Sequence, residues 1–108
     1  MPKYLIEASY TAEGLKGLAK DKASGRVKAV SAAAATLGGS VEAFYFIFGD
    51  RDAILLLDLP DNATAAGFSL AAASSGLVTV KTTPLLTAEE VDRALKVKSG
   101  YKAPGKAK

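Results

Sequence analysis

Two short segments of this chain, residues 3–10 and 77–83, alternate in side-chain character at a period of two, and between them residues 27–37 repeat apolar side chains at helical spacing. Alternation at a period of two is typical of strands with one buried face, whereas apolar residues three and four positions apart mark one face of a helix. Strands and helices therefore follow one another along the chain. This order restricts the fold to the mixed α+β class.

The first predicted strand covers residues 3–10 and leads into a long helical segment. Thr11 is the predicted N-cap of that helix, because a threonine side chain can accept a hydrogen bond from the first helical turn. A polar stretch over residues 21–26 is expected to interrupt the helix, which then resumes with one apolar face. Gly38 and Gly39 end it, since glycine readily adopts the left-handed conformation that follows a helix.

A β-hairpin is predicted next. Aromatic and β-branched residues indicate a strand over residues 41–48 and a second strand over residues 53–59. The short connection between them, residues 49–52, has the sequence Gly-Asp-Arg-Asp. Glycine and aspartate favour a tight turn, so the two strands should pair directly.

A second helix and a fourth strand complete the predicted fold. Asp61 or Asn62 is expected to cap an alanine-rich helix that reaches about Ser75, and residues 77–83 alternate again as a strand. The pattern Thr-Ala-Glu-Glu is a capping box, and it opens a short last helix over residues 87–97. The order β-α-β-β-α-β is that of the ferredoxin-like sandwich, with a four-stranded antiparallel sheet and here a C-terminal helix.

The chain has 108 residues, which suits one domain and is too short for two. We place the folded domain at residues 1–97 and a flexible basic tail at residues 98–108, where glycine, proline and lysine predominate. The net charge of +3 arises at this end of the chain, because no acidic residue follows Asp92. A solubilising tail is the favoured interpretation, and we do not expect nucleic acid to be a partner.

The composition excludes several kinds of site. Cysteine and histidine are both absent, which excludes disulfides, thiolate nucleophiles, imidazole bases and the usual zinc sites. No catalytic residue, cofactor or metal site is therefore predicted. No apolar run reaches the roughly 18 residues of a membrane span, and the N-terminus lacks the features of a secretory signal. We expect a cytoplasmic protein with no membrane partner.

The alternation assigns each strand residue to one of two sheet faces. One set is almost entirely apolar and is expected to lie under the two long helices. It comprises Tyr4, Ile6, Ala8, Val41, Ala43, Tyr45, Ile47, Ala53, Leu55, Leu57, Leu59, Val78 and Val80. The opposite set is mixed in character. It comprises Leu5, Glu7, Glu42, Phe44, Phe46, Phe48, Ile54, Leu56, Asp58, Thr79, Lys81 and Thr83.

Three phenylalanines, Phe44, Phe46 and Phe48, make the mixed face a large apolar patch if nothing covers it. Large exposed apolar patches are uncommon on monomers and usually mark an interface or a groove. Homodimers are the commonest assembly, so we predict that copies of the chain associate through this face. The alternative is that the terminal helix, residues 87–97, folds across the face and covers it.

Three charged residues, Glu7, Asp58 and Lys81, are also predicted on the mixed face. Burying a charge without a partner is costly. These side chains therefore either form an ion-pair cluster at the sheet edge or interface, or line a small ligand pocket beside the phenylalanines. Elsewhere, Arg26 and Lys28 are interpreted as a solvated basic loop, with anion binding as the alternative.

Four aspartates, Asp50, Asp52, Asp58 and Asp61, are the remaining candidates for a Mg²⁺ or Ca²⁺ site. Aspartate also stabilises turns by accepting hydrogen bonds from nearby backbone. We favour that second role for the three aspartates at predicted turns.

Several segments resemble the GYD domain family: Pro2-Lys-Tyr-Leu-Ile, Phe44-Tyr-Phe-Ile-Phe-Gly-Asp-Arg-Asp52, Leu59-Pro-Asp-Asn62 and Lys81-Thr-Thr-Pro-Leu-Leu-Thr-Ala-Glu-Glu-Val-Asp92. The resemblance covers residues 1–92. The family's hairpin turn usually carries glycine, tyrosine and aspartate. Gly49 and Asp52 match that pattern, whereas Arg51 follows Asp50 at the position of the tyrosine. The resemblance implies a small bacterial ferredoxin-like domain, related to the dimeric α/β barrel proteins and with no established biochemical activity.

Two classes of function remain as expectations. The favoured one is an oligomeric binding or regulatory module that self-associates through its sheet and holds a small apolar or amphipathic ligand or a partner protein. The alternative, by analogy of fold, is a cofactor-independent enzyme of the dimeric α/β barrel monooxygenase type. Those enzymes often have histidine, tryptophan or asparagine in the barrel cavity, and this chain has neither histidine nor tryptophan.

Overall fold

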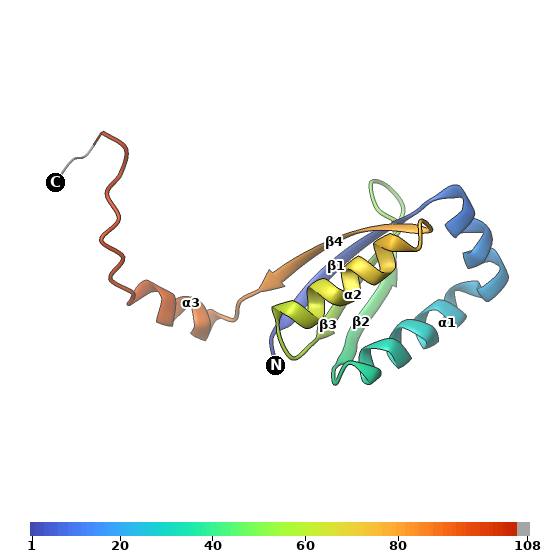
Figure 1. Ribbon diagram of the computed structural model, residues 1–108, viewed down its shortest axis with the longest axis horizontal. Coiled ribbons are helices and arrows are strands. Elements are labelled where there is room, and N and C mark those ends of the chain that lie inside the picture. The colour runs from blue at the N-terminus through green and yellow to red at the C-terminus, as the bar shows by residue number, and fades with distance from the viewer. Residues whose placement is uncertain (106–108) are drawn as a thin grey trace.

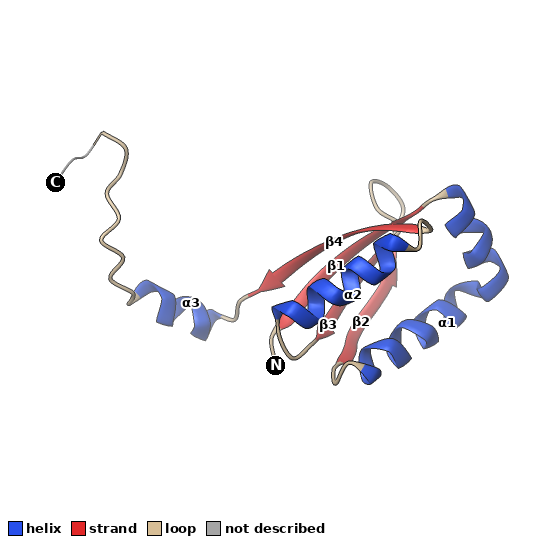
Figure 2. Ribbon diagram, in the orientation of Figure 1, coloured by secondary structure: helices blue, strands red, loops and turns tan. Residues whose placement is uncertain are grey.

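The computed structural model describes residues 1–105 as a four-stranded antiparallel sheet with two long helices packed on it (Figure 1). The elements are β1 (Lys3–Tyr10), α1 (Ala12–Thr36), β2 (Ser40–Phe46), β3 (Ala53–Asp58), α2 (Asn62–Ser74), β4 (Val78–Leu85) and α3 (Ala88–Leu95). The strands lie in the order β2-β3-β1-β4, so β2 and β4 form the edges. Figure 2 shows the same alternation of strands and helices along the chain. The predicted ferredoxin-like fold is confirmed.

Each helix begins at the predicted cap. The Thr11 hydroxyl accepts a hydrogen bond from the first turn of α1, and the Asp61 carboxylate accepts one from the first turn of α2. At α3, Thr87 and Glu90 exchange side-chain and backbone hydrogen bonds as a capping box. These bonds satisfy N–H groups that have no partner inside the helix.

The predicted interruption of the first helix is a sharp bend within α1. Lys22 has φ 65° and ψ 163°, whereas the helix continues on either side of it. Few residues other than glycine adopt this backbone conformation. Beyond the bend, Ala34 is fully buried, and Val30 and Leu37 pack against the core. The resumed apolar face is therefore confirmed.

The core lies between the sheet and the helices α1 and α2. Its buried members are Tyr4, Ile6, Ala8, Ala53, Leu55, Leu57, Leu59 and Ala65. The apolar face predicted for β1 and β3 is thus confirmed. Tyr4 satisfies its buried hydroxyl by donating to Asn62 Oδ1 at 2.7 Å. Burial raises the pKa of this phenol above its usual value.

The face assignment of β2 is wrong beyond its second residue. The register between β2 and β3 shifts between Val41 and Ala43, which is a β-bulge. One extra residue in a strand moves every later side chain to the opposite face. Phe44 therefore pairs with Leu55, and Phe46 with Ala53, on the face that carries the core.

This bulge removes the predicted patch of three phenylalanines. Phe44 packs against the core, and the centroid of its ring lies 5.1 Å from the centroid of the Phe46 ring. Ala43 and Tyr45 take the vacated positions on the opposite face. Burying a phenylalanine side chain contributes about 1.5–3 kcal/mol, which is more than an alanine at the same position contributes. Phe48 lies beyond the end of β2, in the turn, and is fully exposed.

The alternative in which the terminal helix covers the sheet is contradicted. Figure 1 shows α3 extending away from the sheet, at the end where the N-terminus lies. Leu86, Val91, Leu95 and Val97 are all exposed along this segment. The predicted domain boundary at residue 97 stays a prediction, and residues 106–108 of the predicted tail lie outside the described residues. No described helix is long and apolar enough to cross a membrane.

Candidate functional site

The side of the sheet that faces away from α1 and α2 carries a continuous apolar surface. We call it the open face. Its central row runs across all four strands, since Ala43 pairs with Leu56, Leu56 with Leu5, and Leu5 with Thr83. In the next row, Ile54 pairs with Tyr45, which is 68% exposed. Within residues 1–105, no helix packs on this face.

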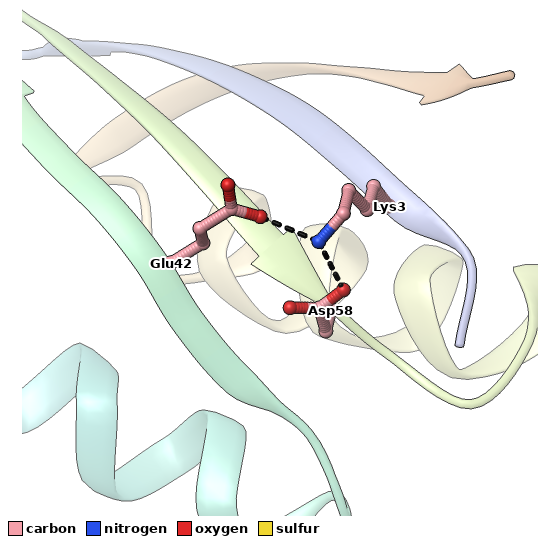
Figure 3. A network of polar contacts seen from close by, with 3 residues as sticks. All are labelled: Lys3, Glu42 and Asp58. Carbon is pink, nitrogen blue, oxygen red and sulfur yellow. Dashed lines mark hydrogen bonds and ion pairs between the residues drawn. The ribbon is translucent and has the colours of Figure 1, made fainter. Parts of the chain in front are cut away.

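A charged network marks one end of the open face. Lys3 Nζ lies 2.5 Å from Glu42 Oε1 and 2.9 Å from Asp58 Oδ1, and so joins β1 to β2 and β3 (Figure 3). Hydrogen bonds to Asp58 and then Glu42 raise the pKa of Lys3 above its usual value. The register makes this contact possible, because Lys3 and Asp58 are direct cross-strand partners. The strand alternation places Lys3 and Asp58 on one face but does not predict that they pair.

The predicted cluster of Glu7, Asp58 and Lys81 does not form as a unit. Glu7 and Lys81 are cross-strand neighbours in the middle of β1 and β4, two rows away from Asp58. Among the described residues, no ion pair joins Glu7 to Lys81. Both side chains lie at the open face beside its apolar rows, where a second surface can meet them.

The turn that resembles the family motif ties the hairpin to β1. Asp52 Oδ2 accepts a hydrogen bond from the Tyr10 N–H at 2.8 Å. The Asp52 N–H donates a second hydrogen bond to the Ala8 carbonyl, also at 2.8 Å. Gly49 has φ 135°, which favours glycine. The Asp50 carbonyl accepts a hydrogen bond from the Ser9 hydroxyl of β1. Arg51 is half-buried in the same turn. These contacts give the turn a structural role.

Metal binding finds no support in the carboxylates. Within residues 1–105, no three acidic side chains gather closely enough to hold a metal ion. Asp52 directly precedes β3, Asp58 is its last residue, and Asp61 is engaged as the cap of α2. The cap lowers the pKa of Asp61, because its carboxylate accepts hydrogen bonds at Thr64.

A second candidate site lies on the helix side of the sheet. A groove of about 780 Å³ runs between α1 and α2 and is lined mostly by apolar side chains. Ala29 and Ala33 of α1 and Gly67 and Ala71 of α2 form part of its walls. A smaller cavity of about 70 Å³ adjoins it and reaches the sheet. Volumes of several hundred Å³ are typical of small-molecule sites.

Arg26 is the one ionisable group among the described residues that line this groove. Its Nε is buried and has no hydrogen-bond partner within residues 1–105, and its Nη1 lies 4.0 Å from Asp21 Oδ2. The sequence predicts a solvated basic loop at Arg26 and Lys28. Lys28 is exposed, as expected, but Arg26 is half-buried. Helical spacing could have predicted that Arg26 is less exposed than Lys28. Arg26 precedes Val30 by four residues, so the two lie on the same face of the helix.

Comparisons with known proteins place the chain in a family without naming an activity. The GYD domain matches residues 4–95, which is nearly the whole chain. A search of curated proteins and a search of solved structures each found no match. The match extends from β1 to the end of α3 and so takes in the sheet and the helices described above. The chain therefore belongs to the GYD domain family.

Proposed function

We propose that this protein is a homo-oligomeric binding module. Copies associate through the open face, and each copy holds a small apolar or amphipathic ligand. The observation that carries the proposal is a sheet with helices on one face and an uncovered apolar row on the other. An open sheet surface of this kind is stable in water when a second sheet packs on it at about 10 Å.

Exposed apolar residues at both ends of the molecule support association between copies. The hairpin turn exposes Phe48 at one end of the sheet, and α3 exposes Val91 and Leu95 at the other. In a two-fold symmetric pair, each surface patch meets a patch of the partner. When two sheets pack with opposed strand directions, the turn of one copy approaches the α3 end of the other.

The charges of the open face are compatible with such an interface. Lys3 already forms ion pairs with carboxylates on β2 and β3. Glu7 and Lys81 are adjacent and of opposite sign. These groups are two lysines and three carboxylates, so each copy carries an excess of one negative charge on this face. Burying that charge would be costly, but Glu42 lies on the edge strand β2 and is 47% exposed, where water can still reach it.

Sedimentation velocity over a wide range of protein concentration tests the association. The expected result is a discrete species of at least twice the chain mass of 11.1 kDa. A single species of the chain mass at every concentration would contradict the proposal. An average mass that rises with protein concentration supports a reversible interface, and its concentration dependence yields the dissociation constant of that interface.

A further inference from the structure

We propose that the groove between α1 and α2 binds an aliphatic monocarboxylate, with the carboxylate at Arg26 and the hydrocarbon chain between the helices. This inference deepens the ligand-binding half of the proposed function, because it assigns the ligand a site and a chemical class. The site lies on the helix side of the sheet, away from the open face.

The shape of the groove indicates a slender apolar occupant. Its walls carry the small residues Ala29, Ala33, Gly67 and Ala71, so the facing helix surfaces leave space that larger side chains would fill. Protein interiors are otherwise packed about as densely as organic crystals. A hydrocarbon chain placed in this space regains the dispersion contacts that the small side chains leave unmade.

The polar groups of the groove point to a single negative charge. The Thr36 hydroxyl already donates to the Ala32 carbonyl within α1, and the Thr64 hydroxyl is engaged with Asp61 at the cap of α2, so both hydroxyl groups of the groove have partners. Arg26 remains as the charged group, and 33% of its side chain is exposed. The ligand therefore needs one anionic group, and a long run of further polar groups would lack partners.

The guanidinium of Arg26 is positioned for a carboxylate. Its Nη1 faces Asp21 at 4.0 Å, which is a weak contact, and its Nε has no acceptor among the described residues. Arginine binds carboxylates through two parallel hydrogen bonds from the planar fork of its guanidinium. Because Nε is itself buried, a carboxylate in the groove meets the terminal nitrogens, where Asp21 supplies only the weak contact. Arg26 also lines the adjoining cavity, so this group sits where the two spaces meet.

Calorimetric titration with straight-chain carboxylates, from hexanoate to decanoate below their micelle concentrations, tests the site. Affinity should rise by about fourfold for each added methylene until the groove is filled. Decanol should bind about tenfold or more weakly than decanoate. Decanol has no negative charge, so it cannot form the charge-assisted hydrogen bonds that a carboxylate forms with the guanidinium. Equal affinity for the acid and the alcohol would overturn the assignment of the charged group.

Substitutions at Arg26 test the same point from the protein side. Arg26→Gln should weaken decanoate binding about tenfold to a hundredfold, and Arg26→Lys should recover part of the loss, because it keeps the charge without the fork. Lys28→Gln is the matched control, since Lys28 is exposed on the same helix and does not line the groove. Equal losses in Arg26→Gln and Lys28→Gln would show surface charge attraction only and overturn the site.

Filling the groove tests where the hydrocarbon chain lies. Ala33→Leu places a large side chain in the groove and should abolish measurable decanoate binding. Ala32→Leu makes the same change at an exposed position of α1 outside the groove and should leave the affinity unchanged. Unchanged binding in Ala33→Leu would overturn the proposal.

The outcomes are distinguishable from those of the association proposal. Decanoate should bind equally well to a Leu56→Asp variant, because Leu56 lies on the opposite face from the groove. A monomeric wild-type protein that binds decanoate through Arg26 contradicts association and supports this inference. An oligomer that binds none of the carboxylates supports association and overturns this inference.

Discussion

Leu56→Asp is expected to convert the assembled protein into folded monomers. Leu56 lies in the central row of the open face, between Ala43 and Leu5. In a two-fold interface the substitution occurs twice and places two unpaired carboxylates among apolar side chains. Burying a charge without a partner costs several kcal/mol, so the dissociation constant should rise at least about a hundredfold. Sedimentation velocity measures the shift, and far-UV circular dichroism shows whether the fold persists.

Leu70→Asp is the matched control for this substitution. Leu70 lies on α2 and is 70% exposed. The substitution therefore makes the same chemical change on the helix side of the sheet. We expect its oligomeric state to equal that of the wild type. A Leu56→Asp protein that keeps the wild-type mass would show that the open face is not the interface. A loss of assembly in both variants would point to general charge repulsion.

Gly14→Ala is expected to destabilise the fold more than any other single methyl addition in α1. A Cβ atom on Gly14 would lie 1.9 Å from the Leu77 carbonyl oxygen, where no side chain fits. That carbonyl also accepts from the Thr11 N–H at 2.9 Å and so ties the start of α1 to the start of β4. The methyl group forces these elements apart. The free energy of unfolding should fall by about 1–3 kcal/mol or more, measured by urea denaturation.

Gly17→Ala adds the same methyl group three residues later and is the control. No heavy atom lies within 4 Å of a Cβ placed on Gly17. Alanine is the better helix former by about 1 kcal/mol, so this variant should be slightly more stable than the wild type. Both variants must be compared at one protein concentration, because association adds to apparent stability. Equal stability of the two variants would contradict the close approach at Gly14.

The element order was predictable from the sequence because its signals are local. Thr11, Asp61 and Thr87 mark helix starts through hydrogen bonds within one turn. Burial alternates without a break in β1 and β3, so once the polar residues, such as Glu7 and Asp58, mark the exposed set, the buried residues follow from a period of two. Agreement among caps, periods and turns leaves little choice of fold.

The face of β2 was not predictable in the same way. Its segment is apolar at nearly every position, so either set of alternate residues can face the core. The bulge near Glu42 decides between them, and it depends on pairing with β3 rather than on residues close by in the sequence. The register places Phe44 against the core and Tyr45 on the open face. The open face is therefore apolar, as predicted, but the phenylalanines predicted for it do not lie on it.

The candidate site was predictable only in part for a similar reason. Asp58 was expected among charged partners, but the register selects Lys3 and Glu42 rather than Lys81. The groove depends on how far α1 stands from α2, and composition does not reveal that spacing. Alanine-rich helices are compatible with close packing as well as with an open groove. The contribution of Arg26 to that groove emerges from the three-dimensional arrangement.

The most direct test of the central claim is the reactivity of a single thiol on the open face. The chain has no cysteine, so Thr83→Cys introduces the one reactive thiol, next to Leu5 in the central row. Ser74→Cys, exposed on α2, is the control. We predict that maleimide modifies the Thr83→Cys thiol several times more slowly in the assembled protein than in the Leu56→Asp background, whereas the Ser74→Cys thiol reacts equally in both. Equal rates for the Thr83→Cys thiol in the two backgrounds would contradict an interface at the open face.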